Sequence, residues 1–215
     1  METKETILEI KKQFRLFMNG IVSQSMREKG LDYKVNFGIE LPRLKEIASK
    51  FEKNHDVAQA LWKENIRECK IVAGLLQPVD TFYPDIADIW VEDMRYPEIA
   101  ELTVMNLFQH LPYASEKAFE WIAREEPYFQ FCGYMLVARL LMKYGELNER
   151  AENELLDQIV PALSGESGFV FRAASTALRK YASQSKENAR KVRGVLISLP
   201  SSERPEVLSL LEETK

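Results

Sequence analysis

Basic side chains near tight turns are the residues of this sequence that could do chemistry, and that chemistry is anion binding. The stretch "VNFGIELPRLKEIASKF" places Gly38 and Pro42 just ahead of a charged helical pattern. Gly38 permits a tight or left-handed turn, and Pro42 suits the first turn of a helix. Free N–H groups at that helix start, together with Arg43 and Lys45, could hold a phosphate. A solvated helix face is the alternative for these residues.

A second basic region lies toward the end of the chain. Residues 170–194 contain seven basic side chains and a single acidic one, Glu187. Arg172, Arg179 and Lys180 recur at helical spacing and share one helix face. Lys186 and Arg190, four residues apart, share a face of the next predicted helix. The candidate nucleic-acid contacts of this region are Arg172, Arg179 and Lys180, and two more, Arg139 and Lys143, lie four residues apart on the predicted helix at 128–144. A surface paired with acidic residues elsewhere is the alternative.

The cysteines and histidines do not form a reactive centre. Cys69 and Cys132 are 63 residues apart, each in an apolar helical pattern that indicates a buried thiol. His55 and His110 are isolated, whereas a zinc site needs Cys and His at short spacing. The sequence also has no glycine-rich phosphate loop. We therefore expect no metal and no cofactor.

The charge of the chain is unevenly distributed. The net charge is −4, but residues 80–126 alone contain eleven acidic and three basic side chains. A DNA backbone favours a continuous basic track, so this acidic middle is a poor host for DNA. The same segment could dock a basic protein partner.

Length and composition indicate one ordinary globular domain over residues 1–215. No apolar run reaches the roughly 20 residues needed to span a bilayer, so we expect no membrane association. The start, "METKETILEIKK", has no signal-peptide apolar block, which predicts a cytoplasmic protein. A monomer is expected.

Helical periodicity dominates the sequence, which predicts an all-α fold. The first helix has a buried face formed by Ile7, Ile10, Phe14, Phe17 and Ile21. Further helices are predicted at about 42–53, 56–64, 66–77, 84–94, 98–110, 114–125, 128–144, 149–163, 168–183, 187–199 and 204–213. The helix at 128–144 is apolar nearly all round, so we expect it to lie between two others.

The tryptophans hint at a repeat of helix pairs. Trp62, Trp90 and Trp121 recur after 28 and 31 residues, each in the first helix of a predicted pair. Helix pairs at this period are typical of a curved HEAT-like or armadillo-like α-solenoid. An irregular helical bundle is the alternative.

Three segments together resemble the DNA alkylation repair family. The first is the turn into a helix formed by Phe37, Gly38, Ile39, Pro42 and Lys45. The others are "EWIAREEPYFQ" at 120–130 and "FRAASTALRKYA" at 171–182. They occur in the family's order and the resemblance covers about residues 5–200. It implies a HEAT-like helical protein, related to alkylpurine DNA glycosylases, with double-stranded DNA as a partner.

The resemblance also implies where catalytic residues would lie. Active members carry a Trp and, four residues later, an Asp that stabilises the positive sugar formed as the glycosidic bond breaks. They add an Arg and a second Trp that hold the lesion. Without gaps these positions fall on Glu92, Tyr96, Phe131 and Thr176, which are all substitutions. A shift of two or three residues lets Trp90 and Asp93 replace the Trp–Asp pair.

Trp90 and Asp93 are therefore the candidate catalytic residues, three apart on one helix face. The alternative is a core tryptophan and a solvated carboxylate. Three functions remain open: a DNA-binding repair protein that is still a glycosylase, a DNA binder that has lost base excision, and a non-catalytic scaffold that binds a protein through the acidic middle. The resemblance favours the DNA-associated functions.

Overall fold

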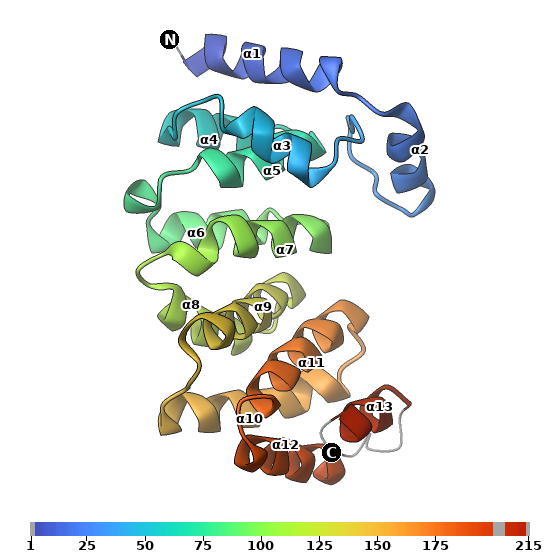
Figure 1. The fold of residues 1–215 in the computed structure, drawn as a ribbon, viewed down its shortest axis with the longest axis vertical. Helices are drawn as coiled ribbons and strands as arrows, with labels where there is room; N and C mark the ends of the chain where they lie inside the picture. Colours follow the sequence, from blue (N-terminus) through green and yellow to red (C-terminus); the bar gives the residue numbers. More distant parts are fainter. Residues whose placement is uncertain (1–2, 200–204, 214–215) are drawn as a thin grey trace. The chain divides into compact units, whose positions relative to one another are not determined.

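The computed structural model describes residues 3–199 and 205–213, and the regular elements of these ranges are helices (Figure 1). One isolated parallel bridge, between Val35 and Ile66, is the exception within the described residues. The prediction of an all-α fold is confirmed.

The chain divides into two compact units, Met1–Leu111 and Pro112–Lys215. Unit 1 contains α1 (Thr3–Leu16), α2 (Gly20–Glu28), α3 (Leu41–Ala48), α4 (His55–Trp62), α5 (Arg67–Leu76), η1 (Val79–Thr81), α6 (Pro84–Glu92), α7 (Pro97–Asn106) and η2 (Phe108–His110). Unit 2 contains α8 (Ala114–Ile122), α9 (Pro127–Tyr144), α10 (Glu149–Ser164), α11 (Gly168–Ala182), α12 (Lys186–Ser198) and α13 (Pro205–Glu213). That residues 1–215 form a single domain stays a prediction.

Local sequence signals explain where many helices begin. Four helices start at a residue whose side chain accepts a hydrogen bond from a backbone N–H three residues on: Asn19, Asn54, Asn148 and Ser185. This cap satisfies one of the N–H groups that have no partner inside the helix. Helices α3, α6, α7 and α9 instead carry a proline in their first turn.

The N-terminal segment differs from the prediction of one continuous buried face. The structure has two helices there: the first ends at Leu16, and Asn19 caps the second. Ile10 and Phe14 are fully buried, whereas Ile21 is 84% exposed. Ile21 keeps the helical spacing of the earlier residues but lies beyond the break, so its position on the predicted face was wrong.

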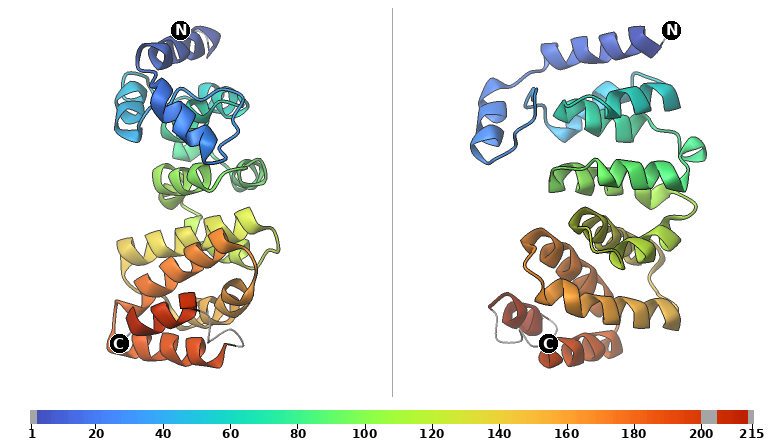
Figure 2. Two further views of the ribbon diagram at one scale, coloured as in Figure 1. Left: turned by 90° about the vertical axis from the view of Figure 1, so that its right-hand side faces the viewer. Right: turned by 180° about the vertical axis from the view of Figure 1, so that it is seen from behind.

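An aromatic stack joins two first helices of neighbouring pairs in unit 1. The ring of Trp62, on α4, lies parallel to that of Trp90, on α6, with centroids 3.9 Å apart. Phe82 packs edge-on against Trp90 at 4.8 Å. The second helices of these pairs also pack together, since α5 contacts both α3 and α7. Trp62 and Trp90 therefore mark neighbouring helix pairs of unit 1, whose helices Figure 2 shows from two further sides.

Helix α9 lies between α8 and α11 in unit 2, as its all-round apolar pattern predicted. Gly133 makes the close approach to α8 possible. A Cβ atom at this position would lie 2.6 Å from Ile122 Cγ2 and 2.8 Å from the Ala118 carbonyl oxygen. The glycine is thus required by packing rather than by backbone conformation.

None of the described helices combines the length and the apolar character that crossing a membrane requires.

Candidate nucleic-acid interface

Helices α9 and α11 pack side by side, and contacts near both their starts and their ends show that they run in the same direction. Near their starts, the ring centroids of Tyr128 and Phe169 are 5.1 Å apart. Near their ends, Gln184, just beyond α11, donates a hydrogen bond of 3.3 Å to the Leu141 carbonyl. The first contact joins residues 41 positions apart and the second joins residues 43 positions apart. A residue of α9 and the residue about 41 to 43 positions later, on α11, therefore lie at the same height along the two parallel helices.

The basic residues of the two helices follow from this register. Arg139 comes eleven residues after Tyr128, and Lys180 comes eleven residues after Phe169. Eleven residues are close to three full helical turns, so each basic residue lies on the same side of its helix as the contacting ring. Arg139 and Lys180 are partly exposed. The two cations therefore lie level on one shared surface.

All the charged residues of α9 and α11 are basic. They are Arg139, Lys143, Arg172, Arg179 and Lys180. We call the solvent-facing side of these two helices, with these five residues, the α9–α11 face. The face unites the five candidate contacts that the sequence indicated in this region. Five positive charges without a carboxylate on either helix suit a polyanion.

An exposed aromatic ring borders this face, and the sequence prediction missed it. Tyr144, in the last turn of α9, is 67% exposed, and the Lys143 ammonium lies 4.9 Å from its ring centroid. An aromatic face beside a cation can stack on a nucleic-acid base. The signal in the sequence is an aromatic residue directly after a basic one at the end of a helix.

Trp90 lies inside unit 1 and is 1% exposed. Its ring is covered by Trp62 on one face, and its Nε1 donates to the Gln59 side-chain oxygen at 3.2 Å. The hydrogen bond satisfies the polar end of the indole, as a buried tryptophan requires. In this conformation Trp90 is a core residue, and its predicted role at a reacting sugar remains a prediction.

Asp93 ends helix α6, and its carboxylate is 2.6 Å from the Lys70 ammonium. Lys70 also donates to the Trp62 carbonyl at 2.8 Å and lies 4.5 Å from the centroid of the Trp62 ring. A pocket of about 490 Å³ contains Trp90 and Asp93 along its wall, together with Lys63 and Arg95. The structure thus brings the two candidates to one pocket, but the carboxylate there is neutralised by a lysine.

The positions that an ungapped comparison would make catalytic have structural partners instead. Tyr96 packs on Tyr33, with ring centroids 4.2 Å apart. Phe131 is 6% exposed, and the Thr176 hydroxyl donates to the Arg172 carbonyl. Glu92 is exposed on α6. None of these four side chains, all within the described residues, supplies a carboxylate in an enclosed site.

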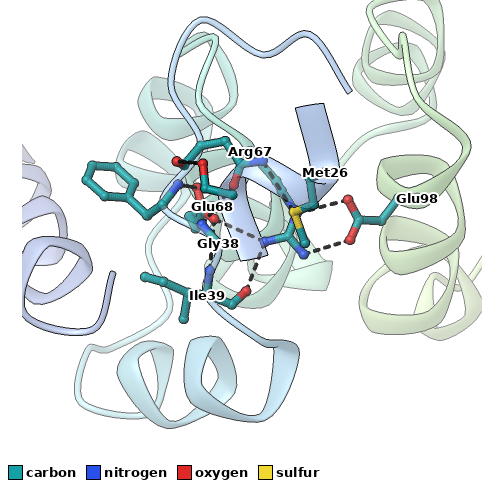
Figure 3. Close-up of polar contacts among 9 residues, drawn as sticks. Met26, Gly38, Ile39, Arg67, Glu68 and Glu98 are labelled. Atoms are coloured by element: carbon teal, nitrogen blue, oxygen red, sulfur yellow. Dashed lines mark hydrogen bonds and ion pairs between the residues drawn. The ribbon is translucent and has the colours of Figure 1, made fainter. Parts of the chain in front are cut away.

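The turn at Gly38, which the sequence singled out, is tightly constrained. Gly38 has a φ of +70°, and a Cβ atom there would lie 2.3 Å from the Asn19 carbonyl oxygen. The N–H groups of Phe37 and Ile39 donate to the Glu68 carboxylate at 3.1 and 3.3 Å. The turn therefore does bind an anion, but that anion is the protein's own buried Glu68 (Figure 3).

Arg67 completes this buried network, which the sequence did not indicate. Its guanidinium makes a two-pronged contact with Glu98 at 2.9 and 2.6 Å. It also donates to the Ile39 carbonyl at 2.9 Å and to Glu68 at 3.0 Å (Figure 3). The only available signal was the position of Arg67 and Glu68 at the start of a strongly apolar helix, directly before the buried Cys69.

Arg43 and Lys45 lie on α3 in unit 1. The Arg43 guanidinium pairs with Glu46 and lies 4.5 Å from the centroid of the Phe17 ring. Lys45 is exposed. Pro42 has no N–H group, so the first turn of α3 offers fewer donors to an anion than an ordinary helix start. Their predicted nucleic-acid contacts remain predictions.

The acidic middle of the chain is partly neutralised inside the fold. Glu98 pairs with Arg67, Asp93 with Lys70, and Glu120 with Lys117 at 2.9 Å. At least three of the acidic side chains of this segment are thus held by cations.

The cysteines behave as the sequence predicted. Cys69 and Cys132 are free, buried thiols. Burial raises the pKa of Cys69 to about 12 and also raises the pKa of Cys132, so both thiols are neutral at ordinary pH. Across residues 3–199 and 205–213, no group of three or more His, Cys, Asp or Glu side chains could hold a metal ion.

The fold and the basic face define an α-helical repeat protein, and comparison with known proteins agrees. Residues 9–193 match the family of DNA alkylation repair enzymes, and the chain belongs to that family. A search of curated proteins found no match.

A solved structure of similar fold belongs to a protein family related to the HEAT-like repeat DNA glycosylases, with affinity for branched DNA structures. It is 15% identical, covers 99% of this chain and 94% of its own, and superposes with a TM-score of 0.79. The predicted HEAT-like fold is therefore confirmed.

Proposed function

We propose that this protein binds DNA through the α9–α11 face. The observation that carries the proposal is the arrangement of five basic and no acidic side chains on two adjacent, parallel helices. Membership of the DNA alkylation repair family supports DNA as the polyanion. The similar structure with affinity for branched DNA supports the same partner and adds branched duplexes to the candidate substrates.

The dimensions of the face suit contacts with several phosphates. Arg172 and Lys180 are eight residues apart, which corresponds to about 12 Å along α11. Base pairs follow one another at about 3.4 Å, so the two cations span between three and four base-pair steps. Arg139 adds a third cation at the level of Lys180. Binding through such contacts depends on charge rather than on sequence.

We further propose that the Trp90–Asp93 pair does not excise bases. A carboxylate that stabilises a cationic sugar has to face it, whereas Asp93 is paired with Lys70 at 2.6 Å. An aromatic ring that holds the lesion has to be accessible, whereas Trp90 is 1% exposed. These contacts support a DNA-binding protein whose candidate catalytic pair has a structural role.

The test is a fluorescence-anisotropy titration of a labelled duplex at several salt concentrations, together with single-turnover base release from duplex methylated at purine N7 and N3. We expect binding that weakens linearly in a log–log plot with salt, and base release no faster than spontaneous loss. Absence of duplex binding at low salt would contradict the proposal. The scaffold function, with the acidic middle as its docking segment, would then take its place.

A further inference from the structure

The junction of α1 and α2 exposes three large apolar side chains within six residues. Leu16 is 67% exposed, Met18 61% and Ile21 84%. We call these three residues the α1–α2 tip. Helix α2 stands out from one side of unit 1 in Figures 1 and 2. Single exposed apolar residues are ordinary, but three of them within six residues of the chain mark a contact surface.

The α1–α2 tip is held in place by the Gly38 turn. The Asn19 N–H donates to the Phe37 carbonyl at 2.8 Å, and the Asn19 side chain accepts from the Val22 N–H at 3.2 Å. The same turn is fixed by the buried carboxylate of Glu68. A flexible loop would lose conformational entropy on binding, whereas this tip is already ordered.

Cations surround the base of the tip. The Arg43 guanidinium and the Lys50 ammonium lie 4.5 and 6.0 Å from the ring centroid of Phe17, which is between Leu16 and Met18. Arg15 lies in the last turn of α1. Glu46 pairs with Arg43 in this group. An apolar tip with cations beside it is complementary to a nucleic acid whose nucleobase faces are exposed between phosphates.

We propose that the α1–α2 tip inserts into DNA where the base stack is already open, at a branch point, while Arg15, Arg43 and Lys50 hold the flanking phosphates. Met, Leu and Ile side chains are used as wedges between base steps in other proteins. In an intact duplex the wedge must first unstack the bases, and at a branch that cost falls away. The inference rests on the proposed function, because the α9–α11 face supplies affinity for the duplex itself.

An anionic membrane would also attract an apolar tip with cations beside it, but the tip is small for a membrane anchor. Its three side chains have fewer carbon atoms together than one myristoyl chain, which alone gives only marginal, reversible membrane binding. Membership of a DNA repair family also favours DNA. Membrane binding is therefore treated as an outcome of the test.

The test compares a three-way DNA junction with an intact duplex of equal length, using Met18→Gln/Ile21→Gln. Both side chains are exposed, so the variant should fold normally. The matched control is Leu8→Gln/Ile89→Gln, which changes two side chains of similar exposure, 68% and 60%, in the same unit. We expect the tip variant to lose about tenfold in junction affinity with unchanged duplex affinity, and the control to match wild type.

A second readout follows insertion directly. A 2-aminopurine at the branch point should brighten when wild type binds and not when the tip variant binds. Equal junction affinity of variant and wild type, or an equal loss for junction and duplex, would overturn the inference. If the tip variant loses the binding to phosphatidylserine vesicles that wild type shows but still binds the junction as wild type does, the tip binds a membrane and the inference is overturned. Failure of wild type to bind intact duplex would instead count against the α9–α11 face.

Discussion

The Gly38 turn in unit 1 and the α9–α11 face in unit 2 both have the sequence pattern of an anion site, but they differ in which anion they meet. At the turn, backbone N–H groups and Arg67 bind two carboxylates of the protein itself, Glu68 and Glu98. Helices α9 and α11 contain five basic residues and no acidic one. One region has an internal anion, and the other has none on its own helices.

The difference shows what a basic residue in a sequence can mean. Arg67 is 3% exposed, and a buried guanidinium requires carboxylates because an unpaired charge in the interior is strongly destabilising. Exposed cations such as Arg172 are solvated by water and can exchange that water for phosphate. A carboxylate buried beside the cation, as at Arg67, thus marks a structural role.

The largest expected effect comes from removing the internal anion. Glu68→Ala should lower the free energy of unfolding by about 3–5 kcal/mol, because it removes one of the two carboxylates of buried Arg67 and leaves the N–H groups of Phe37 and Ile39 buried without a partner. Urea unfolding measures it. Glu46→Ala removes an exposed carboxylate paired with Arg43 and should cost no more than about 1 kcal/mol. If Glu68→Ala and Glu46→Ala lower the free energy of unfolding equally, the buried carboxylate is no more important to stability than the exposed one.

The next effect concerns the α9–α11 face, whose two helices carry no acidic residue of their own. Arg139→Glu/Arg172→Glu/Lys180→Glu should weaken duplex binding at least about 100-fold, or about 2.7 kcal/mol, because each reversal replaces a phosphate contact with repulsion. Circular dichroism should show an unchanged fold. The control is Lys4→Glu/Lys29→Glu/Lys53→Glu, three exposed lysines of unit 1. A comparable loss in the control would mean that binding follows total charge rather than the face.

A smaller effect is expected at the candidate catalytic carboxylate. Asp93→Asn removes the charge pair with Lys70 at a side chain that is 47% exposed, so stability should fall by at most about 1 kcal/mol. Duplex affinity should not change. Measured base release should stay at the spontaneous rate in both wild type and variant. If wild type releases methylated bases and Asp93→Asn does not, the carboxylate is catalytic after all.

The smallest effect is a dependence on pH within unit 2. A hydrogen bond from Lys191, 2.5 Å away, lowers the pKa of the Glu152 carboxyl in the folded protein. Its stabilising contribution is present above the ordinary carboxyl pKa and is lost as pH falls through the lowered value. Glu152→Gln should therefore shift the urea midpoint downward at pH 7, and the shift should vanish in strong acid. Asp157→Asn, an exposed change on the same helix, should show no such pattern.

Most of the fold could be predicted from the sequence because its signals are local. The apolar periodicity places α9 at 128–144 against an observed Pro127–Tyr144, and the proline and asparagine caps mark other starts within a residue or two. The break at Asn19 was missed because Ile21 continues the helical spacing. Beyond the end of α1, the Asn19 N–H donates to the Phe37 carbonyl, which is distant in the sequence.

The sequence could predict which basic residues form the α9–α11 face, but not which side chains and helices they lie against. The five basic residues of α9 and α11 could be chosen from their spacing, since residues on one helix face are fixed by the helical period. That the two helices run side by side depends on tertiary contacts such as Tyr128 with Phe169. The pairing of Asp93 with Lys70, 23 residues away, likewise has no local signal.

The salt dependence of duplex binding shows whether the α9–α11 face contacts the phosphates of DNA. Wild type and Arg139→Ala/Arg172→Ala/Lys180→Ala would be compared by the slope of log affinity against log salt concentration. If the three side chains each contact one phosphate, the slope of the variant should be less steep by about 2.7, because each contact contributes about 0.9. The same slope in both proteins would contradict the account and place the DNA on another surface.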